Sequence, residues 1–245
     1  MANIKVKGLI IRQSDYGQGH RMLTVFTDEY GIIKAVSYGA RRTRSTQSAA
    51  SQFLCYGDFD LYKGGGEVSS INRIDSIENF YPIHEDLTKL SLCTYFAEIT
   101  CAILDYNNPD PNVLRLLLNM LYACAYRNIP LRTLKLVYEL RLMTLGGYMP
   151  QVHSCIRCGS AEQLEAFDLA AGGVLCRKCG GGSQVLSPEA LKVLRYILAC
   201  PDKKILSFTA GPAALEQLGA LSEAYLKMHL DKPFASLAYL HAVLQ

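Results

Sequence analysis

The sequence predicts an α+β protein, in which a small five-stranded β-barrel is followed by an α-helical bundle with an inserted four-cysteine module. Three observations carry this prediction. Apolar and polar residues alternate in short runs over the first part of the chain, apolar residues recur at helical spacing later, and two close cysteine pairs interrupt the helical pattern. We therefore expect a barrel domain over residues 1–80 and a helical domain over residues 81–245, with the cysteine module at about residues 150–183.

Short strands separated by turn residues account for the first domain. We expect turns at residues 14–19, 28–31 and 63–67, and a polar stretch over residues 39–51 that is too long for a hairpin loop. Five strands in about 80 residues fit a Greek-key barrel of the OB type, although an SH3-like barrel would show much the same spacing. The expected strands are residues 4–10, 21–27, 32–38, 53–62 and 68–77.

Start signals and apolar stripes predict the helices of the second domain. Asp110-Pro111 and Ser187-Pro188 each place an N-cap residue before a proline at the first helical position, and Pro130 begins another helix that ends at Gly146-Gly147. We expect the apolar stripes to form the core, although a groove of the bundle could also receive a partner's peptide. The stripes are Leu87, Leu90, Thr94 and Ala97; Leu114, Leu117, Leu118, Leu121, Tyr122 and Ala125; Leu191, Leu194, Ile197 and Leu198; and Leu215, Leu218, Leu221, Tyr225 and Met228.

The cysteine module has the spacing of a structural metal site. Cys155-x2-Cys158 and Cys176-x2-Cys179 are separated by 17 residues, and a two-residue gap lets both sulfurs of a pair reach one ion. A redox dithiol is the alternative for one such pair, but two pairs favour zinc. Four protein ligands leave no position open for water, so we predict one structural Zn²⁺ ion with His153 a nearby surface residue.

The remaining cysteines and the charged residues close to the module have simpler expected roles. Arg157, Arg177 and Lys178 lie near enough in sequence to offset the negative charge of four thiolates. Gly159 and Gly180 follow the two pairs, where a tight turn benefits from unrestricted φ. The other five cysteines sit among apolar neighbours and are expected in the core: Cys55, Cys93, Cys101, Cys124 and Cys200.

Composition and absent motifs exclude several classes. The chain is 50% apolar and 19% charged, which is the balance of a globular protein, and it contains no apolar run of the ~18 residues needed to span a bilayer. The first ten residues lack the apolar region of a secretory signal, so we expect a cytoplasmic protein. The sequence has no P-loop, no HExxH and no GxSxG motif, and its five histidines are dispersed, which argues against an enzyme.

One basic segment indicates nucleic acid. No acidic residue lies between Tyr30 and Gly57, whereas four cations do, and two arginines belong to the neighbouring predicted strands. Arginines there can neutralise phosphates, and nearby tyrosines can stack on unpaired bases. A solvated basic loop with core tyrosines is the alternative. The candidate contacts are Arg12, Arg21, Lys34, Tyr38, Arg41, Arg42 and Arg44, with Tyr16 and Tyr56 as further aromatic faces.

Several motifs occur in the order found in a known family. They are Ile10-x-Arg12, Tyr16-x3-His20-Arg21, Gly39-Ala40-Arg41-Arg42, Tyr138-Glu139-Leu140-Arg141-Leu142, Gly147-Tyr148-x-Pro150, Phe167-Asp168 and Gly172-Gly173-Val174-Leu175-Cys176. With these motifs the sequence resembles the bacterial RecO family of recombination mediators along most of its length. The resemblance implies an OB domain, a helical domain and a zinc module.

The resemblance also implies a function. It implies a non-enzymatic DNA-repair protein, associated with the nucleoid, that binds single- and double-stranded DNA and anneals complementary strands. It further implies work with RecR to load RecA onto strands covered by single-strand-binding protein. The family often has Pro-Lys where this chain has Thr43-Arg44, and some members lack the cysteines, so the metal is not essential to the shared activity.

Two points stay open at the level of sequence. The family's site for the acidic, apolar tail of single-strand-binding protein has no recognisable motif here, and Arg132, Lys135 and Arg141 are candidate contacts because they lie on one predicted helix beside leucines. Two other functions also fit the pattern. One is an RNA-binding OB protein of translation or transcription, and the other is an adaptor whose helical bundle binds a protein tail.

Overall fold

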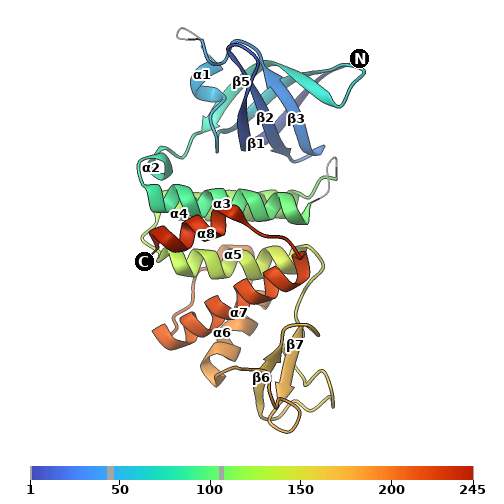
Figure 1. Cartoon of the computed structure of the whole chain (residues 1–245), viewed down its shortest axis with the longest axis vertical. Coiled ribbons are helices and arrows are strands. Elements are labelled where there is room, and N and C mark those ends of the chain that lie inside the picture. Colours follow the sequence, from blue (N-terminus) through green and yellow to red (C-terminus); the bar gives the residue numbers. More distant parts are fainter. Residues whose placement is uncertain (1, 43–46, 105–107, 245) are drawn as a thin grey trace. The chain divides into compact units, whose positions relative to one another are not determined.

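Five strands close into a barrel in the computed structural model, which describes residues 2–42, 47–104 and 108–244 (Figure 1). The strands are β1 (Ala2–Tyr16), β2 (His20–Thr27), β3 (Gly31–Ser37), β4 (Tyr56–Lys63) and β5 (Val68–Glu78). They pair in the order β1-β2-β3-β5-β4, with β4 returning to β1. Only the short β3–β5 pairing is parallel among these neighbours. This order is that of an OB barrel and confirms the predicted fold class.

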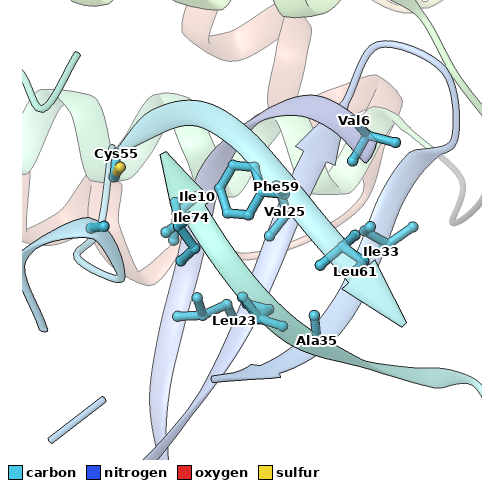
Figure 2. Close-up of a cluster of buried hydrophobic side chains, with 12 residues drawn as sticks. Val6, Ile10, Leu23, Val25, Ile33, Ala35, Cys55, Phe59, Leu61 and Ile74 are labelled. Atoms are coloured by element: carbon cyan, nitrogen blue, oxygen red, sulfur yellow. The ribbon is translucent and has the colours of Figure 1, made fainter. Parts of the chain in front are cut away.

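The barrel is filled by one side of each strand. Leu23 and Val25 of β2 and Ile33 of β3 point inward around Phe59, with polar or outward residues between them (Figure 2). This alternation is the period-two pattern seen in the sequence: it places Leu23 and Val25 in the barrel core and Thr24 and Phe26 on the outer side of β2, where both are nevertheless buried. The outer face therefore carries any side chains available for ligands.

Three local features of the barrel differ from the expectation. β1 continues through Ser14 to Tyr16, so the predicted turn at residues 14–19 shortens to Gly17–Gly19. The polar stretch after β3 contains a short helix, α1 (Gln47–Ala50), and β4 begins only at Tyr56. Backbone hydrogen bonding, which the side-chain pattern does not reveal, sets the bounds of these elements.

The chain divides into two compact units. The first comprises residues 1–126 and 236–245, and the second comprises residues 127–235. Besides the barrel, the first unit contains α2 (Tyr81–His84), α3 (Leu87–Ile103), α4 (Pro111–Tyr126) and most of α8 (Ala235–Val243). Within it α3 packs against β1 and α4 against β2, and the backbone N–H of Ser236 donates to Glu98 Oε2 of α3 at 3.1 Å. Unit one is thus a barrel with its own helical layer.

The second unit holds the cysteine module on a helical support. Its helices are α5 (Leu131–Leu145), α6 (Pro188–Ala199) and α7 (Pro212–Leu230), with a 3-10 turn at Asp202–Lys204. α5 packs against both α6 and α7. The module contributes an antiparallel sheet in the order β7-β6-β8, from β6 (Leu164–Asp168), β7 (Gly173–Cys176) and β8 (Gln184–Val185).

The predicted helix starts are confirmed, whereas part of the predicted core is not. Asp110 Oδ1 accepts from the backbone N–H groups of Asn112 and Val113, and Ser187 Oγ accepts from that of Ala190. The stripe of α6 is buried throughout. Most of the stripes of α4 and α7 are buried as well, but some stripe positions face solvent. In α3 the buried face lies mostly on residues outside the predicted stripe, among them Leu92, Phe96 and Ile99. The exposed positions are Leu87, Thr94, Tyr122 and Met228.

The cysteines outside the module follow the expectation closely. Cys55, Cys93, Cys124 and Cys200 are buried, and Cys101 is half-buried. Burial raises the pKa of the Cys55 thiol, as it should for a small apolar side chain.

Candidate nucleic-acid interface and metal centre

Two loops meet at one end of the barrel. The first is the β1–β2 turn with its flanking residues, 15–21, and the second is the segment that follows β3, residues 38–42; together we call them the loop cluster. The Arg41 N–H donates to the Gly19 carbonyl at 3.1 Å, and the Gly39 N–H donates to His20 Nδ1 at 2.9 Å. Gly19 and Gly39 both have positive φ, of 80° and 71°, which other residues adopt at a cost. The two loops therefore form one surface.

Aromatic rings are exposed on this surface. Tyr16 pairs with His20 across the β1–β2 register, and the His20 ring meets the Tyr38 ring edge-on, with centroids 5.1 Å apart. Tyr38 is 59% exposed and Tyr16 is 46% exposed, so neither is a core tyrosine. Tyr56 is only partly buried and lies on β4. Exposed aromatic faces of this kind can stack on unpaired bases.

The two arginines of the cluster differ in what holds them. Arg41 Nη1 pairs with Asp15 Oδ2 at 2.9 Å, with the arginine side chain 42% exposed. The Arg42 side chain lies over both glycines, because a Cβ on Gly19 would sit 3.7 Å from Arg42 Cγ and one on Gly39 would sit 3.7 Å from Arg42 Cδ. Arg42 is exposed and is paired with no carboxylate of the described residues. Its charge is available to a phosphate.

Arg12 and Lys34 lie on the outer face of the same three strands. Arg12 is opposite Thr24, and Thr24 is opposite Lys34, so the two cations flank one threonine in a single register row. Both side chains are exposed, whereas Thr24 between them is buried. The structure thus gives these two cations the same outer face of the barrel.

Arg21, another candidate contact, makes hydrogen bonds within the barrel unit. Arg21 Nη1 donates to the Ser48 carbonyl at 2.9 Å, to the Ser51 carbonyl at 3.3 Å and to Ser51 Oγ at 3.0 Å. These contacts hold α1 and the residues after it against β2, so Arg21 has a structural task. Arg44 lies outside the described residues.

The opposite side of the barrel has balanced charge. Lys5 faces Asp60 and Lys7 faces Asp58 across the β1–β4 register, and Arg73 Nε pairs with Asp75 Oδ1 at 2.7 Å. Lys5, Lys7 and Arg73 thus each have a carboxylate opposite or bonded to them, and Lys63 of β4 lies over the Tyr30 ring. A polyanion approaching this barrel would therefore be drawn to the loop cluster rather than to β4 and β5.

The four cysteines of the module converge. Cys155, Cys158, Cys176 and Cys179 place their four sulfur atoms within 4.8 Å of one another. The Sγ atoms of Cys158 and Cys176 are 3.6 Å apart, close to the about 3.8 Å separation that a tetrahedral ion with Zn–S bonds of about 2.3 Å requires. The cluster can hold one metal ion, and His153 is an exposed residue outside it.

Two turns of similar hydrogen bonding present the sulfurs. The Gly159 N–H donates to the Cys155 carbonyl, and the Gly180 N–H donates to the Cys176 carbonyl, each at 2.8 Å. Gly159 has φ of 76°, as expected. Gly180 does not have positive φ; a Cβ there would lie 2.8 Å from the Ala166 Cβ, so close packing on β6 is the reason for that glycine. The expected need for unrestricted φ is therefore confirmed at Gly159 and is wrong at Gly180.

The donor set calls for a cation. Backbone hydrogen bonds, chiefly at Cys176, lower the pKa of Cys155 to about 6, whereas hydrogen bonding with the other thiols, first Cys176, raises the pKa of Cys179 to about 12. Four thiolates held this close together would repel one another. A divalent ion removes that repulsion, so the residues present fit a Cys₄ metal centre.

Two of the three basic residues around the module form ion pairs with carboxylates. Arg157 Nη2 pairs with Asp168 at 3.3 Å and its Nη1 donates to the Cys179 carbonyl, while Arg177 forms two hydrogen bonds with Glu165. The Arg177 guanidinium lowers the pKa of Glu165 accordingly. The expected charge compensation by Arg157 and Arg177 is therefore shared with carboxylates, and Lys178 remains exposed.

The candidate partner-binding cations on α5 have distinct surroundings. Lys135 is buried and contacts Glu139 Oε1 at 2.8 Å and Glu223 Oε2 at 2.9 Å. Arg141 Nη2 pairs with Asp202, and its Nη1 donates to carbonyls at the end of α6. Both charges are neutralised inside the second unit. Arg132 is exposed.

The comparison with known proteins agrees with this architecture. Residues 1–80 match the family model for the Recombination protein O N terminal domain, and residues 84–238 match that for its C terminal domain. The chain belongs to the RecO family. Proteins named DNA repair protein RecO are similar to it along nearly their whole length: that of Acetivibrio thermocellus is 34% identical over 98% of this chain and 97% of its own. That of Alkaliphilus metalliredigens is 31% identical over 94% of both chains.

Two residues of the loop cluster were not predicted from the sequence of this RecO-family protein. His20 and Asp15 became visible only with the register of β1, β2 and β3, because that register brings His20 beside Tyr38 and Asp15 beside Arg41. A histidine just before Arg21 in the family motif was the only signal.

Among the helices of the described ranges, none has the length and apolar character to cross a bilayer.

Proposed function

We propose that this chain is a non-enzymatic mediator of DNA repair and recombination that binds single- and double-stranded DNA through its loop cluster, at the nucleoid. The observation that carries the proposal is the gathering of Tyr16, Tyr38, Arg41 and Arg42 at one end of an OB barrel. Membership of the RecO family and relatives named DNA repair proteins support it.

Each residue has a defined task in this proposal. Arg42, together with Arg12 and Lys34 on the same outer face, neutralises backbone phosphates. Arg41 does so from a position fixed by Asp15. Tyr38 and Tyr16 offer their rings to unpaired bases. Arg21 supports the site by holding the segment after it, and Arg44 would add charge to the same loop.

Annealing follows from electrostatics alone. Two complementary strands repel each other through their phosphates, and a protein that neutralises both lowers the cost of bringing them together. No bond is made or broken by the protein, so no nucleotide hydrolysis is needed. Arginine serves this purpose because its guanidinium keeps its charge at all accessible pH values and bonds phosphates in a fork.

The metal centre has a structural task in the same proposal. A Zn²⁺ ion held by Cys155, Cys158, Cys176 and Cys179 would join the two turns of the module. With residues 1–80 as the DNA-binding domain and 81–245 as the helical domain, the ion stabilises the frame of the helical domain and takes no part in binding DNA.

Partners follow from the family. We propose cooperation with RecR, indirect loading of RecA, and docking of the acidic tail of single-strand-binding protein on the helical domain. Arg132 is retained as a tail contact because it is exposed on α5, whereas Lys135 is buried and Arg141 bonds Asp202 within the second unit.

A strand-annealing assay tests the proposal. Complementary oligonucleotides, bare or covered with single-strand-binding protein, should anneal faster when the protein is added without any nucleotide. An RNA-binding protein would instead prefer RNA strands, and an adaptor would bind the acidic tail peptide without accelerating annealing or contacting either nucleic acid. Failure to accelerate annealing of bare strands would remove the proposed function.

A further inference from the structure

His20 joins the two loops of the loop cluster. It takes part neither in the Asp15–Arg41 ion pair nor in the packing of Arg42 against Gly19 and Gly39. Its Nδ1 accepts the Gly39 N–H at 2.9 Å, and its ring meets the Tyr38 ring at 72° with centroids 5.1 Å apart. Tyr38 directly precedes Gly39, so one imidazole fixes both the backbone and the ring of this segment. Tyr38 itself is 59% exposed and has no other ring contact among the described residues.

The contact depends on the charge of the imidazole. Nδ1 can accept a hydrogen bond only when it carries no proton, so this geometry is that of neutral histidine with its hydrogen on Nε2. Once protonated, both ring nitrogens are donors, and Nδ1–H would face the Gly39 N–H. Histidine is the side chain that ordinarily changes charge between about pH 5 and 8. The segment would then lose the hydrogen bond that fixes it.

Charged and titratable groups surround His20 on three sides. Tyr16 lies opposite it on β1, and Tyr38, which directly follows β3, lies beside it. The Asp15–Arg41 pair is close by, and Arg42 lies over Gly19 and Gly39 next to it. Arg21 follows it on β2 but donates to Ser48 and Ser51. The charged side chains nearest to the ring are therefore those of Asp15, Arg41 and Arg42.

We propose that His20 is the positioning residue that lets the loop cluster select unpaired bases. Neutral His20 holds Tyr38 as a rigid stacking platform, and protonated His20 releases it. This inference rests on the proposed function, because it assumes that the loop cluster binds DNA. It adds to that function a reason why the loop cluster should bind a single strand that carries bases more tightly than an abasic strand.

The proposal separates two effects of acid that act in opposite directions. Protonation adds a positive charge, which strengthens attraction for phosphates, and it removes the hydrogen bond that orients Tyr38, which weakens base stacking. Affinity for an oligothymidine strand therefore falls relative to affinity for an abasic strand of equal length. The ratio of the two affinities reports stacking alone, since both strands carry the same phosphates.

The experiment measures that ratio for the full chain at about pH 8 and about pH 5.5, values on either side of ordinary histidine titration. For the wild type we expect the ratio to drop by roughly fivefold or more at low pH, the loss of about one stacked base. His20→Asn keeps an acceptor for the Gly39 N–H but cannot titrate, so its ratio should be the same at both pH values. His20→Phe keeps the ring contact without an acceptor, so its ratio should be low at both.

The outcomes decide between the alternatives. A wild-type ratio that is equal at the two pH values, or the same acid-induced drop in His20→Asn, overturns the role of His20. Circular dichroism of each variant at both pH values verifies that the fold is kept. Binding of the abasic strand distinguishes the two levels of inference: if neither strand binds at either pH, the proposed function fails, whereas abasic binding with an unchanged ratio sinks the role of His20 alone.

Discussion

In the proposed function, Arg42 is the residue on which DNA binding by the barrel should depend most. Its guanidinium is exposed and is paired with no carboxylate of the described residues, whereas Arg41 shares its charge with Asp15. Gly19 and Gly39 allow its side chain to lie across the cluster because a larger residue at either position would need a left-handed backbone and space beside Arg42.

Replacing Arg42 with Gln should therefore weaken single-strand binding in a salt-dependent way. Loss of one phosphate contact reduces the slope of log affinity against log salt by about 0.7. Arg73→Gln is the matched control, since Arg73 is an exposed arginine of the same barrel bonded to Asp75 on the far strands. Titrations at a series of salt concentrations should give an unchanged slope for the control; an unchanged slope for Arg42→Gln takes this residue out of the interface.

A second residue-scale prediction concerns the buried ion pair of the second unit. Glu139 is fully buried, accepts from Ser222 Oγ at 2.6 Å and faces Lys135. Lys135→Ala leaves that carboxylate without its cation, which should cost about 3 kcal/mol of unfolding free energy. Lys227→Ala, which removes an exposed partner of Glu223, should cost less than about 1 kcal/mol. Equal losses in denaturant titrations would show that the buried pair is not special.

The pH dependence of this pair has a definite sign. Burial alone would lower the pKa of Lys135, but the carboxylates of Glu139 and Glu223 outweigh it and raise the pKa above its ordinary value. A raised lysine pKa stabilises the folded state fully below the unfolded value of about 10.4, and the contribution is lost as pH rises through the folded pKa. The difference in stability between wild type and Lys135→Ala should thus be constant through neutral pH and shrink only in strong alkali.

Residue types were predictable from sequence more readily than their surroundings. The clustering of the four cysteines was predictable because the spacing of metal ligands is a local feature of the sequence. The two tyrosines were candidate stacking faces with a core position as the alternative, and only the structure shows that Tyr16 and Tyr38 are exposed. Arg21 likewise looks like its neighbours in the sequence, and only the contact with Ser48 and Ser51, about 30 residues away, reveals its structural task.

At the scale of elements, we predict that the cysteine module depends on a bound metal ion to join its turns. Replacing Cys176 with Ser removes one ligand, so the purified protein should lose its metal and several kcal/mol of stability in the second unit. Metal analysis of protein prepared without chelator should find about one zinc per wild-type chain. Cys101→Ser, outside the cluster, should keep both metal and stability; a metal-free wild type would contradict the centre.

Element boundaries followed the sequence where a cap or a proline marks them. Asp110 and Ser187 begin α4 and α6 as expected, since a side-chain acceptor and a following proline act locally. The cap of α3, Asp86, was not foreseen, although its Oδ1 accepts from Thr88 and Lys89. The extension of β1 to Tyr16 comes from pairing with β2, a contact that no local pattern encodes.

At the scale of the whole molecule, the proposed DNA interface and the candidate metal centre lie in different compact units. The loop cluster belongs to residues 1–126 and 236–245, and the four cysteines belong to residues 127–235. Each unit keeps its own core, so damage to the metal centre should leave the barrel's charges in place. We expect Cys176→Ser to bind oligothymidine with the wild-type salt slope, measured below its unfolding temperature; a reduced slope would tie the metal to DNA binding.

The most direct test of the central claim is to map where DNA touches the chain. A single strand carrying photoreactive thymidine analogues, cross-linked to the wild-type protein and digested, should yield labelled peptides from residues 15–21 and 38–42 of the loop cluster. Arg41→Gln/Arg42→Gln should lose most of this labelling while keeping its fold by circular dichroism. Labelling confined to β4 and β5 or to residues 127–235 would contradict the account.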